Sequence, residues 1–154
     1  MKSKLTVIII CLIMLANCGF KVVTNDVNFK IEEIKTIGDN RVNYILKQKL
    51  LIKSFDQSKK PIFLTINTKK NKSIKEKNIS NQITKYELKI DIDVEYKEMD
   101  GDVLEKFLLS KSGSFDVASK HSETLSNEKN LLNLIVNDLV EDILYNLNNK
   151  LNDS

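Results

Sequence analysis

The clearest pattern in the chain is a strict alternation of apolar and charged side chains across residues 85–97. This period of two is typical of a β-strand with one buried face and one solvated face. The apolar row is Tyr86, Leu88, Ile90, Ile92, Val94 and Tyr96. Because tyrosines end the row, we expect their hydroxyls to reach water at the rim of the core.

A hairpin is predicted directly after this strand. Asp100–Gly101 is a dipeptide typical of tight turns between strands. The return strand is expected over residues 103–117, and Gly113 within it is expected to mark a bulge.

Two further strands are predicted earlier in the chain. Val27–Ile34 alternates apolar and polar positions, and Ile62–Asn67 is an apolar run that begins after Pro61. Residues 68–81 follow and are polar, with five lysines and one glutamate. We expect this Lys-rich stretch to be an exposed hairpin loop or a frayed edge.

Apolar stripes with a spacing of three or four residues predict two helices. The first covers Arg41–Ser54, after a turn and cap at residues 38–40. The second covers about Ser126–Leu147, with Ser126 and Glu128 at its expected start.

The predicted order of elements is therefore β-α-β-β-β-α. Each helix has one apolar stripe, so both can cover the same face of a sheet. We expect an α+β two-layer sandwich, with two helices packed on one face of a mostly antiparallel four-stranded sheet. The length of 154 residues suits one such domain, which we place at residues 27–149 with a tail at 150–154.

The N-terminus has the pattern of a bacterial lipoprotein signal. A short basic segment precedes the apolar run Leu5–Leu15, which has the length of a signal-peptide core and is too short to span a bilayer. The sequence Leu15–Cys18 resembles a lipobox, so we expect residues 1–17 to be removed and Cys18 to be lipidated. Residues 18–26 would form the lipidated tether. The alternative is a buried cysteine at the edge of an uncleaved hydrophobic helix.

The predicted location is the periplasmic side of the outer membrane, because Gly19 rather than aspartate follows the cysteine. Acyl chains on Cys18 would anchor the chain to that membrane. The formal net charge is only +3, which argues against an electrostatic nucleic-acid binder.

Few residues could support catalysis or hold a metal ion. His121 is the only histidine, and we expect it to be a solvated side chain although Asp116 and Ser122 lie near it in sequence. Asp91, Asp93 and Glu95 share one strand face and could bind a divalent cation, but lysines share that face. We therefore predict no enzyme, no metal and no cofactor.

The Lys-rich stretch is a candidate for binding phosphates of lipid headgroups or lipopolysaccharide. The alternative is an ordinary solvated loop. The candidate side chains of this stretch are Lys69, Lys70, Lys72, Lys75 and Lys77.

Several segments, in order along the chain, resemble the lipopolysaccharide-assembly lipoprotein family LptE, in its branch with a Cys-Gly-Phe start. The N-terminal one is Cys18–Phe20, where the mature chain would begin. The others are Asp39–Arg41 before the first helix, Thr84–Leu88 at a strand start, Ser114–Val117 with Ser119, Asn127–Asn130 and Leu139–Ile143. The order of elements agrees as well.

The resemblance implies a function without chemical catalysis. LptE-like lipoproteins plug the outer-membrane β-barrel LptD and help it to insert lipopolysaccharide into the outer leaflet. Membership would give this chain an LptD-type barrel and lipopolysaccharide as partners. It also adds Lys85, in the segment Thr84–Leu88, to the candidate lipopolysaccharide contacts. An alternative from a different class is an outer-membrane lipoprotein that binds or activates another envelope protein. A lipid-anchored hydrolase is disfavoured, because no nucleophile-base pair is present.

Overall fold

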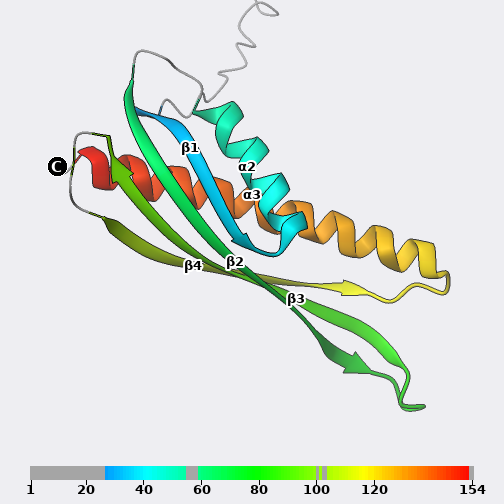
Figure 1. The fold of residues 1–154 in the computed structure, drawn as a ribbon. Coiled ribbons are helices and arrows are strands. Elements are labelled where there is room, and N and C mark those ends of the chain that lie inside the picture. Colours follow the sequence, from blue (N-terminus) through cyan, green and yellow to red (C-terminus); the bar gives the residue numbers. More distant parts are fainter. Residues whose placement is uncertain (1–26, 55–58, 100, 102–103, 153–154) are drawn as a thin grey trace, which may run out of the picture.

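The structure, a computed structural model, describes residues 27–54, 59–99, 101 and 104–152. Within these residues the chain forms six elements in the order β-α-β-β-β-α (Figure 1). They are β1 (Phe29–Gly38), α2 (Asn40–Lys53), β2 (Lys60–Lys77), β3 (Ile83–Glu98), β4 (Glu105–Asp116) and α3 (His121–Asn152). The predicted α+β fold and order of elements are confirmed. The predicted signal peptide, Cys18 and the tether lie outside the described residues.

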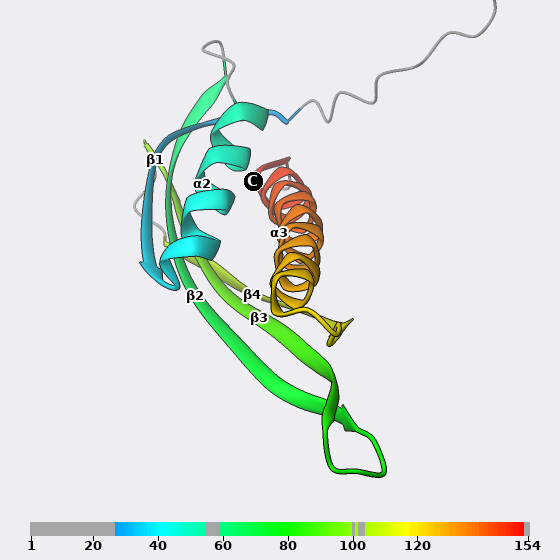
Figure 2. The same cartoon turned by 90° about the vertical axis from the view of Figure 1, so that its right-hand side faces the viewer.

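The four strands form one sheet in the order β1-β2-β3-β4. β1 is parallel to β2, whereas the other two pairs are antiparallel, so the sheet is mostly antiparallel as predicted. Both helices cover the same face of the sheet (Figure 2). A parallel pair needs a crossover connection, and α2 provides it between β1 and β2. Below, "helix face" means the covered side of the sheet and "outer face" the opposite side.

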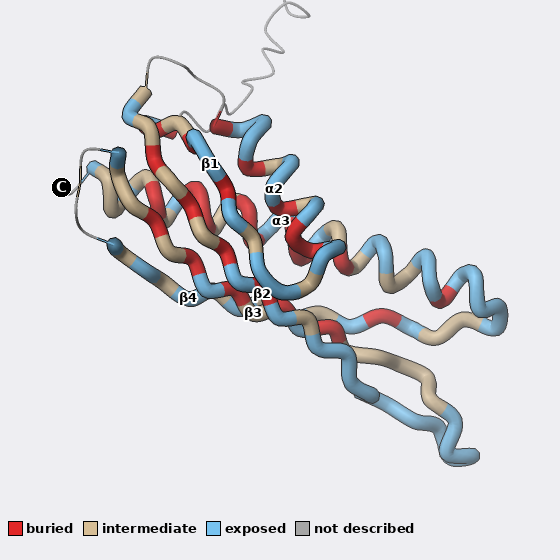
Figure 3. The backbone as a smooth tube through the Cα atoms, in the orientation of Figure 1, coloured by how far each residue is buried: buried red, intermediate tan, exposed pale blue. Residues whose placement is uncertain are grey.

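The core lies between the sheet and the helices and contains the apolar rows that the sequence pattern identified. In Figure 3 the buried positions alternate along the middle of the strands, whereas the far end of the β2–β3 hairpin is exposed. The row of β3 from Leu88 to Tyr96 is buried. The buried apolar side chains of α3 are Leu132, Ile135, Val136, Leu139, Val140, Ile143, Leu144 and Leu147. Burial of this core stabilises the fold, since each Å² of apolar surface removed from water contributes about 25 cal/mol.

The junction of β1 and α2 is fixed by a glycine, a helix cap and a buried hydrogen-bond network. Gly38 has φ +102°, a backbone conformation that other residues rarely adopt. Asp39 is the N-cap and accepts the N–H of Val42 at 2.9 Å. The hydroxyl of Thr68 donates to the side-chain oxygen of Asn43 at 2.8 Å and accepts the N–H of Asp39 at 3.0 Å. Thr68 and Asn43 are both buried, so this network ties the turn to β2.

The predicted first helix matches α2 within one residue at each end, but α3 is longer than its apolar stripe predicts. It begins at His121, not at Ser126, and continues to Asn152. The hydroxyl of Thr124 accepts the N–H of Ala118 at 3.0 Å and so fixes the first turn. Because this contact is polar, the hydrophobic periodicity of the sequence does not reveal it. The predicted tail from residue 150 therefore begins inside the helix.

The prediction that residues 68–81 form a loop or frayed edge is wrong. β2 continues to Lys77, and only residues 78–82 connect it to β3. The strand persists without an apolar row because it pairs with β3 along its whole length and faces opposite charges there, as in Lys69–Asp91. We call this hairpin, residues 69–91, the arm. Its far end projects beyond both helices (Figures 1 and 2).

Two smaller expectations are also wrong. The β3–β4 register has no shift, so Gly113 marks no bulge. A Cβ on Gly113 would lie 2.7 Å from a methyl carbon of Leu131, so this glycine makes room for α3. The hydroxyl of Tyr96 donates to the carboxylate of Glu105 at 2.7 Å, whereas we expected it to reach water. Burial and this carboxylate raise the pKa of Tyr96 well above its ordinary value.

The predicted hairpin after β3 is present, because β3 and β4 pair antiparallel from Tyr96–Glu105 onwards. Asp100 and the first predicted residues of the return strand lie outside the described residues. The N–H of Gly101 donates to the carbonyl of Glu98 at 3.2 Å, which is the hydrogen bond of a β-turn.

Candidate functional site

All six candidate lysines lie on the arm. Five are in β2 (Lys69, Lys70, Lys72, Lys75 and Lys77), and Lys85 is in β3. Successive residues of a strand point to opposite faces, so these side chains do not all project from one surface. Lys69 is in the row of the outer face, whereas Lys70 and Lys72 continue the helix-facing row of Ile66 and Thr68.

Four of the six lysines form ion pairs with carboxylates. Lys70 lies 3.2 Å from Asp39, Lys72 lies 2.6 Å from Glu128, and Lys75 lies 3.9 Å from Glu87. Lys85 lies 3.0 Å from Glu76 and 3.8 Å from Asp116. Among the described residues, Lys69 and Lys77 have no such ion pair, and Lys77 donates to the side-chain oxygen of Asn81 at 3.0 Å.

Two of these ion pairs, Lys70–Asp39 and Lys85–Glu76, shift the pKa of one partner. Burial raises the pKa of Asp39, but the N–H of Val42 and the ammonium of Lys70 outweigh it and hold that pKa below its ordinary value. The hydrogen bond and charge of Glu76 raise the pKa of Lys85. Lys85 is therefore held in its charged form beside Glu76.

Lys72 connects the arm to the start of α3. Its ammonium lies 4.4 Å from the ring centre of Tyr86 and 5.0 Å from that of Phe115, and these two rings stack at 5.6 Å. Its partner Glu128 belongs to α3. Lys72 thus combines a cation–π contact with an ion pair across two layers, which indicates a structural role.

We expect Lys72→Ala to lower the free energy of unfolding by about 1–2 kcal/mol, the sum of a partly exposed ion pair and a cation–π contact. Urea unfolding of the non-lipidated chain would measure this. Lys89→Ala is the matched control, because Lys89 forms an exposed pair with Asp91 at 2.9 Å and should cost only a few tenths of a kcal/mol. Equal losses in the two variants would contradict the assigned role of Lys72.

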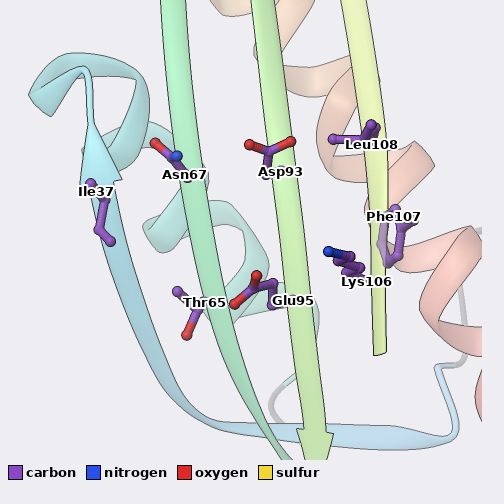
Figure 4. A pocket seen from close by; sticks show the side chains of 8 residues that line it. All are labelled: Ile37, Thr65, Asn67, Asp93, Glu95, Lys106, Phe107 and Leu108. Carbon is purple, nitrogen blue, oxygen red and sulfur yellow. The ribbon is translucent and has the colours of Figure 1, made fainter. Parts of the chain in front are cut away.

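The outer face of the sheet contains a hollow that the sequence did not reveal. It has a volume of about 550 Å³ and crosses the sheet from β1 to β4 (Figure 4). Its lining residues are Ile37, Thr65, Asn67, Asp93, Glu95, Lys106, Phe107 and Leu108. One cross-strand row joins Ile37, Asn67, Asp93 and Leu108 through their register partners.

Two exposed apolar side chains border this hollow. Ile37 is 60% exposed and Leu108 is 77% exposed. Leu108 is out of phase with Phe107 and Leu109, whose side chains pack against the core on the other face. This break in the alternation is the sequence signal that could have identified the hollow. A single exposed leucine is common on protein surfaces, so the signal is weak by itself.

The candidate catalytic and metal-binding residues do not gather into a site. His121 is the exposed first residue of α3, and Asp116 pairs with Lys85. Asp91 accepts the hydroxyl of Ser110 at 2.6 Å and pairs with Lys89. The described residues contain no group of three or more His, Cys, Asp or Glu side chains placed to hold a metal ion. Within the same residues, no helix is long and apolar enough to cross a membrane.

Comparisons with known proteins show similarity at the level of the fold. No protein-family model matches the sequence, and no curated protein matches it. Rare lipoprotein B from Shewanella oneidensis matches with a TM-score of 0.59 at 9% identity, over 79% of this chain and 97% of that chain. A putative lipoprotein from Caulobacter crescentus matches with a TM-score of 0.56 at 16% identity, over 78% of this chain and 90% of that chain. The chain therefore shares its fold with these two proteins over nearly their whole length.

Proposed function

We propose that this chain is an outer-membrane lipoprotein of the lipopolysaccharide-assembly machinery. The observation that carries the proposal is the shared fold, which covers 97% of rare lipoprotein B. The lipobox-like sequence ending at Cys18 and the ordered LptE-like segments support it independently. In this role the acyl chains on Cys18 hold the domain at the periplasmic side of the outer membrane.

The proposed activity is to plug an LptD-type β-barrel and to aid insertion of lipopolysaccharide into the outer leaflet. A plug must fill a lumen lined mainly by polar side chains. This domain buries its apolar rows between the sheet and the helices, and most side chains of its outer face and arm are polar or charged. The role requires binding surfaces rather than reacting groups, so we propose no catalysis.

The lysines of the arm are proposed to contact lipopolysaccharide phosphates. Lys69 and Lys77 are the best placed, because they have no ion pair among the described residues. Lys70, Lys72, Lys75 and Lys85 would first have to leave their carboxylates.

We expect the double variant Lys69→Gln/Lys77→Gln to bind lipopolysaccharide about ten- to thirtyfold more weakly at low salt, because each lysine near a phosphate surface contributes about 1 kcal/mol. Binding of fluorescent lipopolysaccharide would measure the change. Lys47→Gln/Lys49→Gln in α2 is the control, since it removes the same charge away from the arm. Equal affinities of the two double variants would exclude Lys69 and Lys77 as contacts.

The proposed function itself is tested by depletion. Cells in which this chain is switched off should accumulate newly made lipopolysaccharide inside the outer membrane, and its arrival at the surface should fall. Re-expression of the wild-type chain should restore it. Normal surface arrival after complete depletion would refute the proposal.

A further inference from the structure

β4 is an edge strand, and its outer side has no neighbouring strand among the described residues (Figure 1). The opposite edge, β1, has a register shift between Ile31 and Glu33, and irregularities of this kind protect an edge from further pairing. β4 has no such shift, since its register with β3 is unbroken from Glu105 to Asp116. A straight edge with unpaired backbone groups is a template for a further strand. The geometry of β4 therefore specifies an extended backbone as its occupant.

The backbone groups that point outward from β4 belong to its even-numbered residues. The N–H of Val117 donates to the carbonyl of Thr84 at 2.9 Å, so Val117 faces β3. In an antiparallel pair, successive residues alternate between facing the partner strand and facing away from it. Because the register of β3 and β4 is regular, the odd-numbered residues of β4 face β3. The first three outward-facing residues are Lys106, Leu108 and Ser110.

This edge is complementary to itself when a second β4 runs antiparallel to it about Leu108. Residues equally far before and after Leu108 then lie opposite each other. Leu108 meets its own copy on the outer face, and Phe107 meets Leu109 on the helix face. Glu105 meets Lys111, so opposite charges lie at both ends of the overlap. Opposite residues differ by an even number, so outward-facing backbone groups always meet outward-facing ones.

Such pairing would cover apolar surface that a single copy leaves in water. Leu108 is 77% exposed, and Phe107 and Leu109 are only partly buried although they pack against the core. Every helix-facing side chain from Glu105 to Gly113 is partly exposed, so α3 leaves this edge accessible. Phe107 and Leu109 would form a non-hydrogen-bonded pair, in which opposite side chains come closest. Each copy would therefore complete the open margin of the other's core.

The charged pair can form without loss of the contacts within one copy. Glu105 accepts the hydroxyl of Tyr96 at 2.7 Å and pairs with Lys150 at 3.3 Å, in both cases through Oε2. Lys111 pairs with Asp142 at 2.8 Å, and an ammonium has three N–H donors. Oε1 of Glu105 in one copy can therefore accept from Lys111 of the other.

We propose that two copies of this chain pair edge to edge through β4, in the antiparallel register centred on Leu108. The two sheets then form one continuous sheet about a two-fold axis, with the helices of both copies on the same face. Complementarity fixes the register. Moving its centre by one residue places Lys111 opposite Phe107, or Glu105 opposite Leu109. The inference goes beyond the proposed function and concerns copies that are not inside a barrel.

Disulfide crosslinking in native membranes tests the pairing. The full-length lipoprotein carries Leu108→Cys, and dimers are quantified on a non-reducing gel after mild oxidation. Opposite Cα atoms of a hydrogen-bonded antiparallel pair lie about 5.5 Å apart, within the range that a disulfide spans. Ile52→Cys in α2 is the matched control, because Ile52 is 76% exposed and Leu108 is 77% exposed. We expect about tenfold more dimer from Leu108→Cys, with the wild-type chain as the blank.

Mixed crosslinks test the register. Lys106→Cys and Ser110→Cys should each give little dimer alone, because the two copies of either residue lie about 13 Å apart along the strands. When both variants are expressed together, they should form a mixed dimer as readily as Leu108→Cys does. Equal crosslinking of Leu108→Cys and Ile52→Cys would overturn the pairing. Equal crosslinking of Lys106→Cys alone and of the mixture would overturn the register.

A single charge at the two-fold axis tests the same pairing without oxidation. Two copies with different tags are co-expressed, and one tag is used to recover the other from mild detergent. We expect Leu108→Lys to lose this recovery, because it places two ammonium groups opposite each other. Ile52→Lys should retain it. Equal recovery by the two variants would overturn the proposal, whereas the outcome of the depletion experiment does not bear on it.

Discussion

Gly38→Ala is expected to lower the free energy of unfolding by about 3 kcal/mol or more, the largest loss we expect from a single methyl group. The residue has φ +102°, and a side chain there costs about 1–2 kcal/mol. The added Cβ would also lie 1.9 Å from the carbonyl oxygen of Thr68, so the backbones of β1 and β2 must move apart. That movement weakens the hydrogen bonds of Asp39 to Thr68, on which the start of α2 depends.

Urea unfolding of the non-lipidated chain, followed by circular dichroism, would measure this loss. Gly101→Ala is the matched control, because its φ is not in the left-handed region and its Cβ would meet only Glu98, at 3.4 Å from the Cβ and 3.8 Å from the carbonyl oxygen. We expect that variant to unfold near the wild-type midpoint. A Gly38→Ala protein as stable as Gly101→Ala would show that the described junction is wrong.

Cys18→Ser is expected to abolish lipidation completely. The thiol of Cys18 is the group to which the diacylglyceryl chain would be attached, and a serine cannot replace it. Without that modification the signal peptide should remain uncleaved, so the protein should migrate as the larger precursor. Labelling with a radioactive or alkyne-bearing fatty acid, followed by gel electrophoresis, measures both effects.

Cys11→Ser provides the control for this experiment. Cys11 lies inside the apolar run Leu5–Leu15, which would leave with the signal peptide. This variant should be cleaved and labelled as wild type is. A Cys18→Ser chain of mature size that still incorporates fatty acid would refute lipidation at this position.

Most of the fold could be predicted because the core elements show their burial in the sequence. The apolar positions of β3 and of α3 contain few polar residues, and each set corresponds to a row of buried side chains. In β1 the pattern shifts by one residue between Ile31 and Ile34, because the register with β2 shifts between Ile31 and Glu33. Such a shift depends on the partner strand and is not evident from one strand alone.

The arm could not be predicted, because its strand character depends on cross-strand pairing rather than on burial. Ser73 and its neighbours are exposed, so no alternation marks them as a strand. Their partners, such as Glu87, are known only once the register is known. The same limitation changed the interpretation of the lysines. The six candidate lysines are divided between two faces of the sheet, and four of them already pair with carboxylates.

The hollow of the outer face could not be predicted either, since it is lined by residues of four strands. Ile37 and Leu108 are 71 positions apart in the sequence, and only the sheet order places them on two sides of Asp93. Sequence patterns identify which side chains avoid water within one element. They do not show which exposed side chains of different elements share a surface.

The most direct test of the central claim is the mass of the complex that this lipoprotein forms in its own membrane. Native mass spectrometry of the tagged chain, extracted in mild detergent, should give one copy of the lipidated chain bound to one large outer-membrane β-barrel. A chain lipidated at Cys18 but recovered alone, or bound only to a protein that is not a barrel, would contradict the account.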